Sequence, residues 1–175
     1  GYLVTDWGDG GHWQFLPVSY LPYAYGAGLS WCVEANKDID IARAADLYAF
    51  RDNAGVMGAF ARDIGNAYKQ AGTEIGNNTI FYMFMLHAVE KPMQDTRLGK
   101  LTAEGLQGTI TYLDEALARL DAAKMDRKDA DLIKAEFRMN AAMAKFACRL
   151  GIARVNAGGV ATSKLPKEAR AQLAA

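Results

Sequence analysis

The first fourteen residues constrain the fold of this chain more than any other segment. They run Gly1-Tyr2-Leu3-Val4-Thr5-Asp6-Trp7-Gly8-Asp9-Gly10-Gly11-His12-Trp13-Gln14. A short apolar run ends abruptly in acids, indoles, a histidine and glycines, which is typical of a buried strand that delivers polar groups into a pocket. A strand needs hydrogen-bonding neighbours and a pocket needs walls. We therefore predict that the chain is the C-terminal piece of a larger enzyme.

The first fifty residues predict alternating strands and helices. Residues 2–6 and 26–32 have the pattern of buried strands, and residues 17–25 have helical spacing. Asp40 can cap a further helix over residues 41–51. Strand, loop, helix, strand, helix is the repeat of a parallel α/β sheet or barrel. We therefore expect an α/β fragment at the start of the chain.

The remainder of the chain predicts a mostly α-helical C-terminal region. Apolar residues recur at helical spacing in four segments, which are 57–71, 78–90, 106–120 and 132–150. Thr102 is the expected N-cap of the third helix, and the last two helices are expected to form an antiparallel hairpin. The predicted domains are therefore 1–52 as the α/β part, 53–156 as a helical extension and 157–175 as a flexible tail.

Composition excludes several classes of protein. Of the 175 residues, 51% are hydrophobic and 23% are charged, which describes a globular core. The formal net charge is zero, so nothing argues for nucleic acid as a partner. The most apolar run, residues 80–86, is far too short to span a bilayer, so no membrane partner is expected. The sequence gives no prediction of the cellular compartment.

The N-terminal loop combines carboxylates with indoles. The side chains concerned are Asp6, Trp7, Asp9, His12 and Trp13. A carboxylate accepts hydrogen bonds from hydroxyl groups, and an indole offers a flat apolar face, so the combination suits a sugar. Trp31 with Glu34 repeats the combination. The alternative is that the indoles pack in a core and the acids cap turns.

The same loop does not suit a metal or a phosphate. Asp6 and Asp9 stand three residues apart, which misses the alternate-position ligands of a calcium loop. The glycines are not followed by a lysine, as a phosphate cradle requires. His12 and His87 fall on different predicted elements, which argues against a zinc site. We expect neither metal nor cofactor.

Three segments carry a resemblance to a known family. Residues 5–14, 17–20 and 26–31 resemble the end of the catalytic barrel in glycoside hydrolase family 20, the β-N-acetylhexosaminidases and their relatives. The resemblance covers about the first fifty residues. It implies that residues 2–6 and 27–32 are strands seven and eight, so that the chain begins with the last two β/α units of a (β/α)8 barrel.

The resemblance also implies roles for individual side chains. Trp7 takes the place of an aromatic residue, usually Tyr, that contacts the acetamido group of the substrate, and Asp9 takes the place of an acid that binds sugar hydroxyls. Trp31 matches the tryptophan beneath the sugar ring. Glu34 stands one residue beyond a hydroxyl-binding Glu of the family, so its match is displaced.

Asp6 and His12 lie within the matching motif, and we include them among the predicted substrate-binding residues without an assigned role.

The family's mechanism is substrate-assisted and departs from the usual scheme of two enzyme carboxylates. The N-acetyl oxygen of the substrate attacks the anomeric carbon, a Glu protonates the leaving group, and a neighbouring Asp orients the acetamido group. That Asp-Glu pair is expected upstream of this chain. The parent protein is thus predicted to remove terminal N-acetylhexosamine residues, and the chain alone is predicted to be inactive.

Two further hypotheses stay open. The chain could be a non-catalytic carbohydrate-binding module that uses Trp7, Asp9 and Trp31 as its platform. Alternatively, residues 54–155 could form a helical interaction or oligomerisation domain, with a homo-oligomer formed through the helical region.

Overall fold

Helices and short helical turns make up the regular structure of the described residues. The computed structural model describes residues 1–7, 11, 13–73, 75–76 and 78–174. Within these ranges one isolated antiparallel bridge pairs Asp52 with Met125, and no strand is present. The chain divides into two units, which are Gly1–Gly65 with Ala116–Asn140 and Asn66–Glu115 with Ala141–Ala175.

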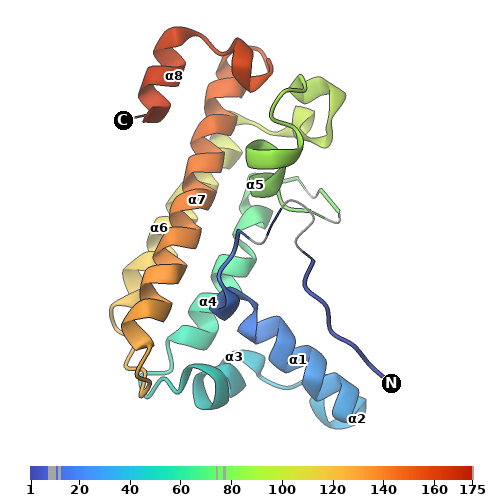
Figure 1. Ribbon diagram of the computed structural model, residues 1–175, viewed down its shortest axis with the longest axis vertical. Coiled ribbons are helices and arrows are strands. Elements are labelled where there is room, and N and C mark those ends of the chain that lie inside the picture. The colour runs from blue at the N-terminus through green and yellow to red at the C-terminus, as the bar shows by residue number, and fades with distance from the viewer. Residues whose placement is uncertain (8–10, 12, 74, 77, 175) are drawn as a thin grey trace. The chain divides into compact units, whose positions relative to one another are not determined.

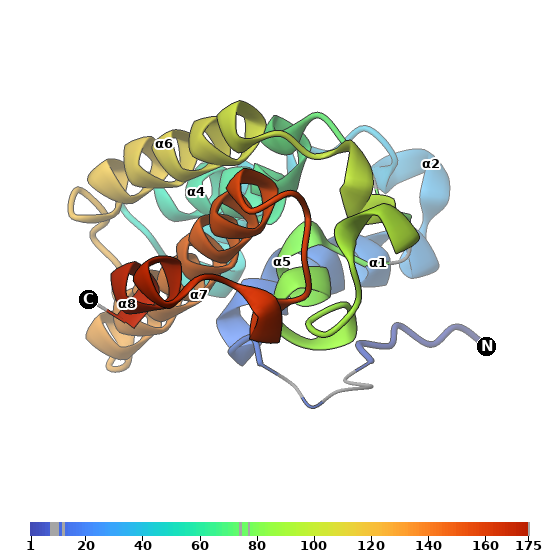
Figure 2. The ribbon, with the colours of Figure 1, turned by 90° about the horizontal axis from the view of Figure 1, so that it is seen from above.

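Eight α-helices occur within the described ranges, and Figures 1 and 2 follow them along the chain. They are α1 (Tyr20–Trp31), α2 (Val33–Asn36), α3 (Ile41–Ala44), α4 (Met57–Gly65), α5 (Ile80–Tyr82), α6 (Ala103–Leu120), α7 (Ala130–Asn156) and α8 (Lys167–Ala174). The connecting segments contain short 3₁₀ or π turns, which are η1 (Leu16–Ser19), η2 (Ala45–Phe50), η3 (Ala67–Ala71), η4 (Met83–His87), η5 (Met93–Asp95), η6 (Arg97–Lys100) and η7 (Thr162–Lys164).

The predicted β/α units are wrong. Residues 2–6 pair with no strand among the described residues, and residues 26–31 of the second predicted strand belong to α1. The tyrosines, the tryptophan and the glycines of segment 20–31 do not by themselves favour a helix, so contacts in the folded chain decide its conformation. Pro22 falls in the first turn of α1, where its missing N–H costs no hydrogen bond. The expected TIM-barrel fragment is therefore replaced by helices.

The N-terminal segment packs on α1 through a close approach. A Cβ atom built on Gly26 would lie 2.9 Å from Cγ2 of Val4. The absence of a side chain at this position lets the extended residues around Val4 approach the helix. The residues predicted as a first strand therefore lie against a helix.

The predicted helix over 41–51 is confirmed in outline. Asp40 is its cap, because its carboxylate accepts a hydrogen bond from the backbone N–H of Arg43 at 3.1 Å. The helix begins as α3, widens into η2 and ends at Arg51, whose φ of 52° is left-handed. The predicted helix over 57–71 is α4 followed by η3, and Gly72 closes it with a φ of 73°.

Aromatic rings form the centre of the first unit. The rings of Phe60 and Phe137 meet edge to face with centroids 5.2 Å apart, and Phe50 lies 6.1 Å from Phe137. All three side chains are fully buried. Since Phe50 lies on η2, Phe60 on α4 and Phe137 on α7, this cluster holds these elements together within the unit.

The helices predicted over 106–120 and 132–150 are confirmed as α6 and α7 (Figure 1). Thr102 is the N-cap, since its hydroxyl accepts a hydrogen bond from the backbone N–H of Gly105 at 3.1 Å. Asp121 pairs with Arg138, and Asp114 pairs with Lys145 at 2.7 Å. From the first pair to the second, the residue number decreases by seven on the side of α6 and increases by seven on α7. The two helices therefore run antiparallel, as expected.

Arg154 organises the end of α7 in the second unit. Its buried guanidinium donates hydrogen bonds to the carbonyl oxygens of Val160 at 2.9 Å, Ala88 at 3.0 Å and Lys91 at 2.5 Å. Three backbone carbonyls thereby gain a hydrogen bond from a side chain. After this point α8 lies beside the end of α7 (Figure 2). Among the described residues, no helix combines the length and the apolarity that crossing a bilayer requires.

Candidate functional site

Four of the six predicted substrate-binding residues can be located. Asp9 and His12 lie outside the described residues. Asp6 and Trp7 belong to the N-terminal segment, Trp31 ends α1 and Glu34 lies in α2. The hydrogen bonds between described residues do not link Glu34 or Trp31 to Asp6 or Trp7.

Asp6 closes the N-terminal loop. Its carboxylate accepts a hydrogen bond from the hydroxyl of Ser19 at 2.6 Å and another from the side-chain amide of Gln14 at 3.2 Å. Ser19 is buried, so its hydroxyl needs this acceptor. The two bonds occupy only part of the acceptor capacity of a carboxylate, which has about four lone-pair directions. Asp6 is half-buried and can still accept a hydrogen bond from a ligand.

The indoles at this end of the chain are uncovered. Trp7 is 78% exposed and Trp31 is 90% exposed, and Trp13 is also exposed. The ring N–H of Trp7 donates to the hydroxyl of Thr5 at 3.0 Å, which orients that ring. Glu34, in contrast, forms an exposed ion pair at 2.8 Å with Lys37, the residue that caps the end of α2. The structure thus presents indole faces and leaves Glu34 in a local surface pair.

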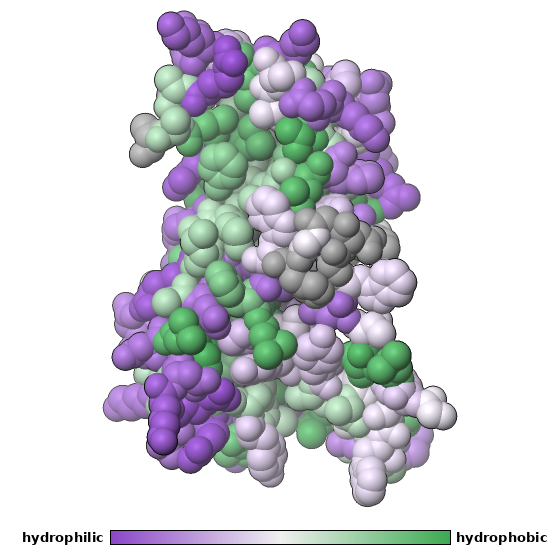
Figure 3. Space-filling view, viewed as in Figure 1, coloured by the Kyte–Doolittle hydropathy of each residue, from purple (hydrophilic) through white to green (hydrophobic). Residues whose placement is uncertain are grey.

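The sequence of α1 and of the residues just before it carries no charge. Residues 13–33 contain no Asp, Glu, Lys or Arg, and α1 has no buried residue. In Figure 3 the surface in this region is pale and green, with few strongly hydrophilic side chains. A helix that is uncharged all round normally lies inside a protein. Here its tyrosine and leucine side chains are partly buried, and Trp31 is exposed and available for contact.

The structure also forms a polar cleft that the sequence analysis did not identify. It has a volume of about 710 Å³ and belongs to the first unit, where α3, η2, residues 51–55 and α4 line it. Its charged side chains include Arg43, Arg51 and Arg62 together with Asp46, Asp52 and Asp126.

Two acids of the cleft cap the start of α4. Asp52 accepts hydrogen bonds from the backbone N–H groups of Ala54, Val56, Met57 and Lys124 at distances of 2.5 to 3.1 Å. Asp46 accepts one from Gly58 at 2.7 Å. Together the two carboxylates satisfy N–H groups that a helix start leaves without partners. The sequence does carry a signal for this cap. Asp52 lies in a polar turn just before the apolar run that starts at Met57, which is where a helix-capping residue is expected.

The two capping acids have opposite pKa shifts. Burial acts to raise the pKa of Asp52, but its four backbone donors outweigh burial and hold the pKa below the ordinary value. For Asp46, burial raises the pKa by more than the hydrogen bond from Gly58 lowers it. The negative charge of Asp52 raises it further. Both groups are occupied by the backbone, so the cleft acids serve the fold.

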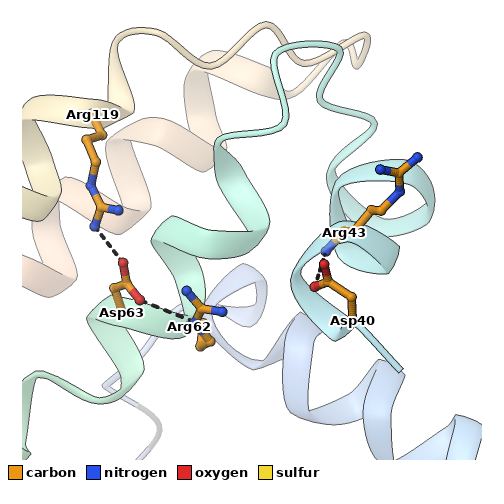
Figure 4. A network of polar contacts seen from close by, with 5 residues as sticks. All are labelled: Asp40, Arg43, Arg62, Asp63 and Arg119. Atoms are coloured by element: carbon orange, nitrogen blue, oxygen red, sulfur yellow. Dashed lines mark hydrogen bonds and ion pairs between the residues drawn. The ribbon is translucent and has the colours of Figure 1, made fainter. Parts of the chain in front are cut away.

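Two of the three arginines that line the cleft, Arg51 and Arg62, are engaged in surface pairs. Arg51 pairs with Asp126 at 2.6 Å. Figure 4 shows Asp63 between Arg62 and Arg119, at 3.3 and 2.8 Å. Exposed pairs of this kind contribute about 0–1 kcal/mol each. Within the described part of the chain, no group of three His, Cys, Asp or Glu side chains is placed to hold a metal ion.

Comparisons with known proteins found no relative of this chain. No known family matches the sequence, no curated protein is significantly similar to it, and no solved structure matches the fold.

Proposed function

We propose that the N-terminal segment binds carbohydrate and contributes to a glycoside hydrolase that removes terminal N-acetylhexosamine residues. The observation that carries this proposal is the exposure of the indole of Trp7 next to Asp6, a carboxylate that keeps acceptor capacity. The substrate class comes from the motif of residues 5–14 and 26–31. The proposal makes no use of barrel strands.

The chemistry of a sugar matches these groups. The C–H face of a pyranose is apolar and stacks on an indole, while its hydroxyl edge donates hydrogen bonds to a carboxylate. The ring of Trp7 is held by Thr5, so less freedom is lost when a sugar packs on it. Residues 13–33 carry no charge of their own, which suits a neutral ligand.

Three of the described carboxylates are engaged within the fold and are not placed to act as a general acid for hydrolysis. Asp6 is held by Ser19 and Gln14, and Asp46 and Asp52 are held by the backbone at α4. A general acid must reach the leaving-group oxygen with its own proton. We therefore expect the 175-residue chain to bind N-acetylglucosamine and not to hydrolyse N-acetylhexosaminides.

Isothermal titration of the chain with N-acetylglucosamine tests the proposal. Trp7→Ala should weaken binding by about three- to tenfold, which corresponds to ~0.5–1.5 kcal/mol for a lost stacking contact. Tyr48→Ala is the matched control, because Tyr48 is an exposed aromatic residue on η2, outside the proposed platform. It should leave the affinity unchanged.

Two results would contradict the proposal. One is the absence of binding by the unchanged chain. The other is equal affinity for glucose and N-acetylglucosamine, since the acetamido group then makes no contribution.

A further inference from the structure

The outward face of α7 carries apolar side chains at a heptad spacing. Leu132 is 60% exposed and Met139 is 51% exposed, and the other members of the row are exposed as well. The row, here termed the outer seam, consists of Leu132, Ala135, Met139, Ala142 and Phe146. The successive steps are three, four, three and four residues.

This spacing is that of the contact positions of a coiled coil. Steps of three and four place the side chains in one line along a helix, where a second helix can pack. The inward face of α7 is already occupied, because Ile133, Phe137 and Cys148 are buried. The solvent face of a helix normally carries charged or polar side chains. The outer seam is therefore a second contact face without a partner in the chain's own described residues.

We propose that the outer seam binds the outer seam of a second copy of this chain, with the two α7 helices antiparallel. The pattern of charge beside the seam selects this partner and this direction. Asp131, Arg138 and Lys145 flank the seam on one side at intervals of seven residues. An antiparallel pair about Arg138 places Asp131 opposite Lys145 of the partner subunit, and the contact occurs twice by symmetry.

A parallel pair is disfavoured by the same residues. In that arrangement Asp131 would face Glu136 of the partner subunit, which brings like charges together. In the antiparallel pair the two copies of Arg138 approach each other at the centre. Each of them is paired with Asp121 of its own chain, which offsets the repulsion between the two guanidinium groups. Lys145 is paired with Asp114 of its own chain at 2.7 Å, so its attraction for Asp131 of the partner subunit is shared with that pair.

Sedimentation velocity of the whole chain over a wide range of concentration tests the pairing. The expected result is a reversible monomer–dimer equilibrium. Met139→Glu places one negative charge from each subunit at the centre of the seam and should weaken the dimer by at least about tenfold. The two carboxylates repel each other, and removing them from water costs free energy that the apolar methionine does not cost. Leu47→Glu is the matched control, because Leu47 is 57% exposed on η2 and lies away from the seam. It should leave the dimer unchanged.

The direction of pairing is tested by Asp131→Lys. In the antiparallel dimer this change replaces an attraction with a repulsion, so the dimer should weaken by about three- to tenfold. In a parallel dimer it would create an attraction with Glu136 of the partner subunit, and the dimer would strengthen. Circular dichroism of each variant checks that its helix content is unchanged.

Three results would overturn the proposal. The proposal would be wrong if the unchanged chain sedimented as a monomer at every concentration. It would also be wrong if Met139→Glu left the dimer intact. A dimer strengthened by Asp131→Lys would overturn the antiparallel direction.

Discussion

Asp52 and Asp46 show at the residue scale how two carboxylates can stabilise one helix start. Asp52 serves four backbone N–H groups and Asp46 serves a fifth. Each acid is buried, so removing its acceptor oxygen leaves donors without partners. These acids also explain why a polar cleft need not be a reaction site.

Asp52→Asn should destabilise the chain by about 1–3 kcal/mol, because one oxygen of the pair is replaced by a donor that faces backbone N–H groups. Asp126→Asn, which alters an exposed pair in the same cleft, should cost ~0.2–1 kcal/mol. Urea unfolding at neutral pH measures both. Equal effects for the two variants would contradict the capping role of Asp52.

The difference in stability between the chain and Asp52→Asn should also depend on pH. The pKa of Asp52 is lower in the folded state than its ordinary value of 3.8. Its ionised form therefore stabilises the fold above pH 3.8, and this contribution is lost as the pH falls through the lowered pKa. Urea unfolding from neutral to acidic pH should show the difference shrinking in acid. A difference that grows as the pH falls would contradict the sign of the shift.

Gly58 allows α3 and α4 to approach closely. A Cβ atom at this position would lie 1.9 Å from the carbonyl oxygen of Ala42. Gly58→Ala should therefore destabilise the chain by about 1–3 kcal/mol or more through forced backbone shifts. Gly108→Ala in α6 meets open space and should stabilise it by ~0.5–1 kcal/mol. Thermal unfolding of the two variants should give melting temperatures that move in opposite directions.

At the scale of elements, α1 and α7 differ in how they are held. α7 contributes Ile133, Phe137 and Cys148 to buried contacts, whereas α1 has no buried residue. Helical hydrogen bonds that face water open more readily than those that a core covers. The two helices should therefore differ in local stability although both are regular.

Hydrogen exchange with mass spectrometry tests this difference. Amides of α1 should exchange fast, and amides over 133–148 should be protected by the buried contacts of α7. Peptides from the two helices in one experiment serve as mutual controls. Equal protection of α1 and α7 would contradict the exposure of α1.

At the scale of the whole molecule, the chain is helical and has no barrel strands within its described part. Far-ultraviolet circular dichroism should accordingly give the double minimum of α-helix. Melting the sample supplies the reference spectrum of the unfolded chain. A spectrum dominated by the single minimum of β-sheet would contradict this fold and restore the expectation of strands.

The substrate-binding roles of Asp6, Trp7 and Trp31 stay a prediction. The combination of indoles and carboxylates could be read from the sequence, because residue type and order are visible there. The exposure of Trp7 and Trp31 and the bonds from Ser19 and Gln14 to Asp6 were not predicted, because the prediction relied on two strands. Asp46 was not anticipated as a cap, since it lies twelve residues from the N–H of Gly58 that it binds.

The sequence by itself determined the helices α6 and α7 and the caps at Thr102 and Asp40. Helical period and capping depend on residues three or four positions apart, so they can be read locally. Only the tertiary structure decided that residues 26–31 are helix, that Gly58 meets Ala42, and that Asp52 reaches Lys124. These outcomes depend on contacts between residues far apart in the chain, and short apolar runs suit strand and helix equally until such contacts choose between them.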